Sequence, residues 1–236
     1  MLKVNSTLIL YFTAFILYVF DVLIGSDNLE LFSKPIIIPS IFYFYYISVR
    51  GKINYLFSFS VWSFFIGEIL HLISRDDFNI SGLIFLLIPY FIILYFIIQD
   101  LLYYLKKQKI KLNTFSFYII VMLLGYLFFS VLMMMIEENS LEFFIYFLYG
   151  ILLVLMGVLA FVMLINYNNR TILYTGFMVG CFILSDLFFV FHKKLPDLIA
   201  LKMINVTTQE LSFFCYISYF IFRTKFKLYG KRDVQN

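Results

Sequence analysis

Residues 80–104 read ISGLIFLLIPYFIILYFIIQDLLYY, an apolar run that Asp100 alone interrupts with a charge. A transmembrane α-helix needs about 20 mostly apolar residues to cross the hydrocarbon core of a bilayer. Seven further stretches of this kind lie at 7–25, 33–49, 54–74, 115–136, 141–165, 171–191 and 201–222. The sequence therefore predicts an all-α fold, a polytopic membrane bundle of about eight transmembrane helices.

The composition agrees with a membrane-embedded chain and leaves no room for a soluble domain. Hydrophobic residues make up 63% of the sequence and charged residues 14%, whereas a soluble domain carries roughly 25% charged residues. The apolar runs are too long and too uniform for the alternating pattern of an outer-membrane barrel. We expect one transmembrane domain over 1–222 and a basic cytoplasmic tail over 223–236.

Basic residues alternate strongly between the predicted loops. Thirteen of the 18 Lys and Arg residues fall on one side, at Lys3 and near positions 50–52, 106–111, 170 and 223–232. Cytoplasmic loops carry an excess of Lys and Arg, so both termini are predicted to be cytoplasmic. We expect a multi-pass protein of the bacterial inner (cell) membrane, in contact with membrane lipids and with no nucleic-acid partner. Protein partners are not indicated by the sequence.

Two carboxylates lie inside predicted spans, Glu68 in SFFIGEILHL and Asp186 in CFILSDLFFVFH. A charged side chain at the bilayer centre costs about 2.5 kcal/mol or more, so such residues usually face a protein interior or a wet cavity. The predicted orientation places both acids in the outer half of the bundle, with Lys34 and Gln209 near the same face. We therefore expect a one-sided polar cavity that opens outward.

Several roles are open for these residues. Glu68 and Asp186 could be structural, each paired with Lys34 or a backbone group. They could instead divide acid and base work, one neutral and one ionised. Glu68 and His71 have the E-x-x-H spacing of carboxylate-bridged metal bundles, but no second such helix is present, and we expect no metal. His71 and His192 are also typical of interfacial aromatic residues.

Other polar residues have simpler interpretations. Gln99 and Asp100 adjoin the basic 105–114 loop and are predicted to contact headgroups, which leaves the inner half of the bundle dry. Glu210, near the start of the eighth span, suits the positive end of a helix.

An ordered set of short motifs resembles the YhhN family of lysoplasmalogenase-like membrane proteins. The motifs are Lys34-Pro35, the stretch 59–68 ending in Gly67-Glu68, Gly82 with Phe85, Ser185-Asp186, and Gln209. They follow one another over nearly the whole chain on an eight-span background. Two positions depart from the family pattern, because the family usually has Asp where Glu68 stands and often has His where Tyr90 stands.

The resemblance implies hydrolysis of the vinyl-ether bond of lysoplasmalogens, which releases a fatty aldehyde. Glu68 and Asp186 would then be the catalytic acid and base, in an order that the sequence leaves open. Lys34, Gln209, His71 and Tyr90 would contact the lysolipid substrate, and no cofactor is implied. The alternative is a non-catalytic lipid-binding protein or a proton-coupled transporter of lipids or small molecules, in which the acids carry protons.

Overall fold

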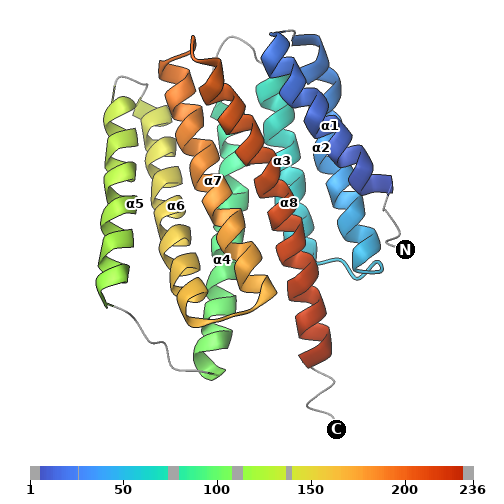
Figure 1. The fold of residues 1–236 in the computed structure, drawn as a ribbon, viewed down its shortest axis with the longest axis vertical. Helices are drawn as coiled ribbons and strands as arrows, with labels where there is room; N and C mark the ends of the chain where they lie inside the picture. Colours follow the sequence, from blue (N-terminus) through green and yellow to red (C-terminus); the bar gives the residue numbers. More distant parts are fainter. Residues whose placement is uncertain (1–5, 26, 74–79, 108–113, 137–139, 231–236) are drawn as a thin grey trace.

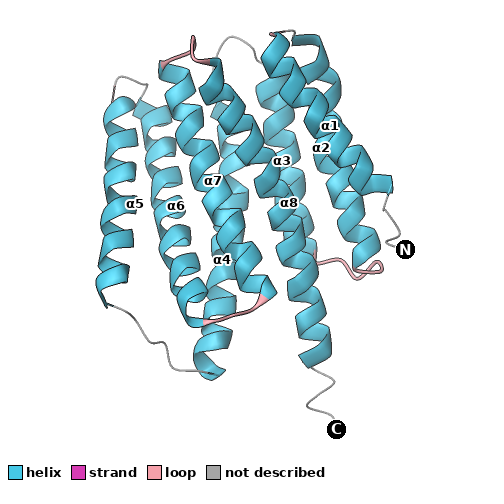
Figure 2. Ribbon diagram, viewed as in Figure 1, coloured by secondary structure: helices cyan, strands magenta, loops and turns pink. Residues whose placement is uncertain are grey.

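The computed structural model describes residues 6–25, 27–73, 80–107, 114–136 and 140–230, and within these ranges the chain forms eight helices and no strand (Figures 1 and 2). The helices are α1 (Ser6–Ile24), α2 (Asp27–Ser48), α3 (Tyr55–Ile73), α4 (Ile80–Lys107), α5 (Thr114–Met134), α6 (Ser140–Asn166), α7 (Arg170–Lys194) and α8 (Ile199–Gly230). The predicted all-helical bundle is confirmed.

Six of the described helices, all except α2 and α8, are long and apolar enough to cross a membrane. This is compatible with a multi-pass membrane protein. The other two helices contain several polar residues: α2 contains Glu30 and Lys34, and α8 contains Gln209 and Glu210.

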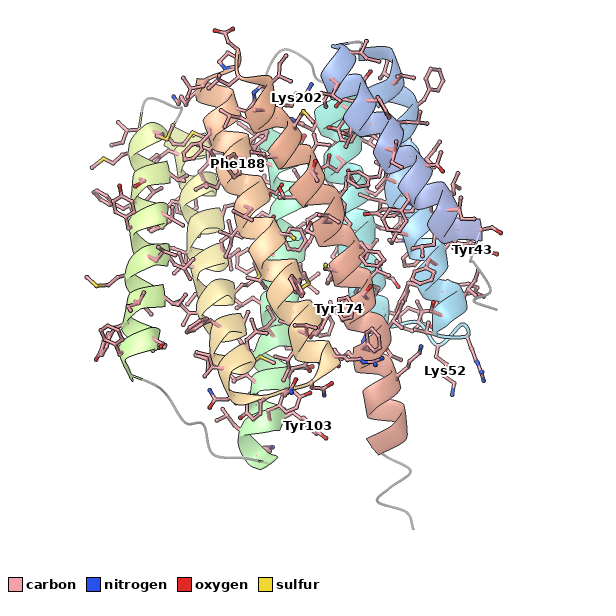
Figure 3. The ribbon with its side chains drawn as sticks, in the orientation of Figure 1. Tyr43, Lys52, Tyr103, Tyr174, Phe188 and Lys202 are labelled. Atoms are coloured by element: carbon pink, nitrogen blue, oxygen red, sulfur yellow. The ribbon has the colours of Figure 1, made fainter. Side chains whose placement is uncertain are left out.

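Successive helices run in opposite directions, so the loops gather at two ends of the bundle (Figure 1). We call the end where α1 meets α2 and α7 meets α8 the cavity end. The opposite end, where α2 meets α3 and α6 meets α7, is the basic end. Figure 3 shows Lys202 near the cavity end and Lys52 at the basic end. The assignment of the basic end to the cytoplasm stays a prediction.

The hairpin of α7 and α8 forms the centre of the bundle. These two helices make the most extensive helix–helix contact in the structure, and α8 also packs against α1 and α2. α5 lies at the edge of the bundle, where it packs on α6 and more weakly on α7 (Figure 1). Most of the α5 surface is thus left free of protein contact.

A closed polar cluster joins α4 to α8 near the basic end. Arg223 Nε donates to both carboxylate oxygens of Asp100, at 2.8 and 2.9 Å, and its Nη2 donates to Gln99 at 3.0 Å. Tyr219 donates its hydroxyl to Asp100 at 2.5 Å. The Arg223 guanidinium also lies over the ring of Phe96, 4.7 Å from its centroid.

The prediction that Asp100 contacts lipid headgroups is therefore wrong. Asp100 is 6% exposed and Arg223 is 5% exposed, because each neutralises the other inside the bundle. Helix α8 continues to Gly230, so residues placed by the sequence in a basic tail extend this helix, and Arg223 packs within the bundle.

Candidate functional site

A cavity of about 560 Å³ lies in the half of the bundle toward the cavity end, and all eight described helices contribute to its wall. Ligand sites for small molecules usually measure about 300–1,000 Å³. The charged residues on the wall are Glu30, Lys34, Glu68, Asp186 and Lys202. The cavity is thus large enough for a small ligand and has carboxylates and ammonium groups within it.

Lys34 is the centre of one network on this wall. Its ammonium lies 2.9 Å from Glu30 and 3.6 Å from Glu68, and it also lies over the Tyr18 ring, 5.3 Å from the centroid. Glu30 and Lys34 are four residues apart on α2, a spacing that places side chains on the same helix face. Lys34 therefore acts as the counter-ion of two acids, one from its own helix and one from α3.

Glu68 has a second partner across the cavity wall. Gln209 on α8 donates its side-chain amide to Glu68 Oε1 at 2.5 Å, while Lys34 lies nearest Oε2. Glu68 is 8% exposed. Glu68 thus has a hydrogen-bond donor at one carboxylate oxygen and a cation near the other.

Asp186 on α7 has a different environment. Tyr90 on α4 donates its hydroxyl to Asp186 Oδ2 at 2.8 Å. In the part of the chain that the structure describes, no Lys, Arg or His forms an ion pair with Asp186. The cavity therefore contains one carboxylate that is paired with a cation and one whose partner is a neutral hydroxyl.

The backbone around Asp186 is fixed by the neighbouring helix. Asn205 on α8 donates to the carbonyl oxygen of Ser185 at 2.9 Å and to its hydroxyl at 3.2 Å. Tyr149 on α6 donates to the carbonyl oxygen of Leu83 on α4 at 3.1 Å. These hydrogen bonds join α7 to α8 on one side of the cavity and α4 to α6 on the other.

Buried aromatic rings pack on the basic-end side of three cavity residues. Phe64, Phe182 and Phe213 each lie one helical turn below a cavity residue, namely Glu68, Asp186 and Gln209. The ring centroids are 5.6 Å apart for Phe64 and Phe182, and 5.3 Å apart for Phe64 and Phe213. All three rings are buried. This aromatic floor separates the cavity from the Asp100–Arg223 cluster.

The structure places five of the six predicted site residues on the cavity wall: Glu68, Asp186, Lys34, Gln209 and His71. Tyr90 lies behind the wall, 3% exposed, with its hydroxyl bonded to Asp186. His192 also lines the cavity, and its buried Nδ1 has no hydrogen-bond partner among the described residues. The catalytic and substrate-binding roles of these residues stay predictions.

The sequence did not single out Glu30, Lys202 or Tyr18, which also line the cavity. Glu30 is 3.9 Å from Lys202 and accepts a hydrogen bond from the Tyr18 hydroxyl at 3.4 Å. Their positions near helix ends resemble ordinary interfacial residues. Only the four-residue spacing of Glu30 and Lys34, which places both side chains on one face of α2, could have indicated their role.

The interpretation of Glu210 as a residue of a helix N-terminus is wrong. α8 begins at Ile199, several turns earlier. Glu210 is 3% exposed, and its Oε2 is buried without a hydrogen-bond partner among the described residues. It lies beside Gln209, behind the cavity wall.

Among the described residues, no group of three or more His, Cys, Asp or Glu side chains is placed to hold a metal ion.

No protein-family model, curated protein or solved structure matches the chain.

Proposed function

We propose that this protein is a membrane-embedded hydrolase of the bacterial cell membrane that cleaves the vinyl-ether bond of lysoplasmalogen-type lipids and releases a fatty aldehyde. The observation that carries the proposal is the pair of carboxylates on one cavity wall, Glu68 held by Lys34 and Gln209, and Asp186 held by Tyr90 alone. Acid–base hydrolysis needs one protonated carboxyl group, which donates a proton, and one ionised carboxylate, which accepts a proton.

Asp186 is the candidate acid. It has no cationic partner within the described residues, so we assign the proton to this carboxyl group. Tyr90 occupies Oδ2, which leaves Oδ1 as the oxygen that carries the proton. Protonation of the alkene carbon distant from the ether oxygen then gives an oxocarbenium ion.

Glu68 is the candidate base. Lys34 and Gln209 are its partners. In the proposed reaction its ionised carboxylate stabilises the neighbouring cation, as paired carboxylates do in glycosidases. Glu68 takes a proton from water while the water oxygen bonds to the cationic carbon, which forms a hemiacetal.

Collapse of the hemiacetal completes the reaction and restores both acids. The carbon–oxygen bond to the glycerol breaks as Glu68 returns its proton to the leaving oxygen. The hemiacetal hydroxyl loses its proton to Asp186, which is again neutral. The net change is the addition of one water molecule to the vinyl ether, giving an aldehyde and an alcohol.

The resemblance to the YhhN family supports this proposal, because the two acids, Lys34 and Gln209 all belong to the motifs that carry it. Glu68 keeps the carboxylate of the usual family Asp and extends it by one methylene. The His that is common at position 90 is replaced here by Tyr90, whose hydroxyl still provides a donor to Asp186.

The closed aromatic floor favours an enzyme or a binding protein over a transporter. Alternating access requires that a central site open to both faces of the membrane. Here Phe64, Phe182 and Phe213 are packed against one another below Glu68, Asp186 and Gln209.

The test is aldehyde release by the purified protein from 1-alkenyl lysophosphatidylethanolamine, with the 1-acyl and 1-alkyl analogues as substrate controls. We expect aldehyde from the alkenyl lipid only. Glu68→Gln and Asp186→Asn should each lower the rate by about 10²–10⁴-fold, since an amide serves as neither proton donor nor base. Asp197→Asn, at an exposed carboxylate near the cavity end, is the matched control and should keep the wild-type rate.

Wild-type protein that is folded but inactive on every alkenyl lysolipid would overturn the proposal. Retention of a third of the activity by either variant would exclude the role assigned to that residue.

A further inference from the structure

The cavity changes in character along the helix axes. At 1.5 Å per residue, Glu30, His192 and Lys202 lie about 3–5 Å from the cavity-end termini of α2, α7 and α8. These three residues line the part of the cavity nearest those helix termini, which we call the mouth. The mouth thus has both positive and negative groups, which suits a polar headgroup.

The carboxylates lie deeper than the mouth. On the same scale Glu68 and Asp186 are about 8–12 Å from the cavity-end termini of α3 and α7. A ligand whose head is at the mouth would therefore place the next part of its length beside these two residues.

The deepest part of the wall is apolar. Leu124, Leu153 and Ile183 lie about 15–20 Å from the cavity-end termini of α5, α6 and α7. With Leu127 and Val154 they form a recess between these three helices, which we call the apolar arm. The described residues of the arm include no charged side chain, so water has no polar partner there and hydrocarbon is favoured.

Two glycines on α6 shape the arm. A Cβ at Gly150 would lie 2.3 Å from the Phe128 ring, and a Cβ at Gly157 would lie 2.8 Å from Leu124. Glycine at both positions thus lets side chains of α5 lie against the α6 backbone. α5 contacts only a few other elements, and it forms the outer wall of the arm.

We propose that the apolar arm holds the single hydrocarbon chain of the lysolipid, and that Leu127 and Val154 determine which chain lengths are accepted. The inference rests on the proposed function, because it places the vinyl ether between headgroup and chain, at the depth of Glu68 and Asp186. The bound lipid has the orientation of a lipid in the leaflet at the cavity end. One cavity of about 560 Å³ serves one chain and its headgroup.

The test compares neighbouring residues on the same helix that face the arm or face away. Leu127→Trp and Val154→Trp fill the arm. Leu123→Trp and Leu155→Trp are the matched controls, since Leu123 is 53% exposed and Leu155 is 46% exposed on the bundle surface. Binding of butanoyl and of stearoyl lysophosphatidylethanolamine to each purified variant is measured by competition against a fluorescent lysolipid.

The arm variants should weaken binding of the stearoyl lipid by about 5- to 100-fold, because filling a packed site costs about 1–3 kcal/mol. Binding of the butanoyl lipid, whose chain is too short to reach the filled part of the arm, should change by less than about twofold, as should binding of both lipids to the control variants. Leu127→Phe and Val154→Phe, smaller changes, give the same comparison if a tryptophan variant does not fold.

The two acyl lipids contain no vinyl ether, so this test is separate from catalysis. Chain-selective loss of binding in a protein that releases no aldehyde would support chain binding in the apolar arm and contradict the proposed hydrolase activity. Aldehyde release together with equal effects of Leu127→Trp and Leu123→Trp on both lipids would keep the hydrolase and overturn the arm.

Discussion

The bundle contains two tyrosine–aspartate pairs that differ in what surrounds them. Near the cavity end, Tyr90 donates to Asp186 at 2.8 Å. Near the basic end, Tyr219 donates to Asp100 at 2.5 Å. Asp100 also receives two hydrogen bonds from Arg223, whereas Asp186 lines a cavity and has no cationic partner within the described residues.

The comparison shows that burial of an acid in a membrane bundle does not by itself identify a site. Asp100 and Arg223 satisfy each other and leave no space for a ligand, which is typical of a structural ion pair. The Asp186 carboxyl has hydrogen-bonding capacity left over and an open volume beside it. This difference leads us to expect that changes near the basic end alter stability, while changes near the cavity end alter turnover.

The largest effect on stability is expected from Arg223→Met. The change leaves Asp100 buried without a cation, and breaking a buried pair in this way costs about 3–5 kcal/mol. The thermal unfolding midpoint of the protein in detergent should fall sharply. The rate of aldehyde release per folded molecule should stay near that of the wild type.

The double variant Asp100→Leu with Arg223→Met is the control for this effect. Replacing both members of a buried pair with apolar residues is often neutral or stabilising, so much of the lost stability should return. A double variant as unstable as Arg223→Met alone would show that loss of the Asp100–Arg223 ion pair does not cause the lower stability of Arg223→Met.

Lys34→Met should act on turnover. Lys34 is the counter-ion of Glu30 and Glu68, so without it the proposed base loses the cation beside its carboxylate. We expect kcat to fall by about 100-fold, at the lower end of general-base effects. Lys202→Met, at a lysine whose side chain is 35% exposed, should mainly raise KM. A rise in KM alone for Lys34→Met would show that Lys34 contacts substrate and does not tune Glu68.

The two tyrosines offer the smallest and most closely matched test. Tyr219→Phe removes a hydrogen bond to an ionised carboxylate, which is worth about 1.5–3 kcal/mol of stability. Tyr90→Phe removes a hydrogen bond to a neutral carboxyl group, worth about 1 kcal/mol, and should lower the rate by about fivefold. Thermal midpoints and initial rates of both variants check the prediction, and equal effects on both quantities would remove the distinction between the two ends.

The helices could be predicted from the sequence because each apolar run is long enough to cross a bilayer. The Asp100–Arg223 cluster could not be predicted in this way. Hydropathy falls after residue 222, and Arg223 looks like a flanking charge until its partner on α4 is known. Asp100 is likewise adjacent to basic residues in the sequence but lies against α8 in the fold.

For the candidate site, the depth of Glu68, Asp186, Lys34 and Gln209 followed from the alternation of helix direction. Their partners did not follow, because the rotation of each helix about its axis determines which groups meet. Tyr90 is one tyrosine among 19, and nothing in its neighbours indicates a bond to Asp186. The apolar arm was equally hidden, since its residues resemble those that face lipid.

The most direct test of the difference between the two ends is the rate of aldehyde release by Asp186→Asn beside that by Asp100→Asn, each normalised to folded protein. The two changes are chemically identical and remove the carboxylate from one cluster at a time. We predict a rate below about one hundredth of wild type for Asp186→Asn and a rate near wild type for Asp100→Asn. Equal rates for the two variants would contradict the assignment of the site to the cavity end.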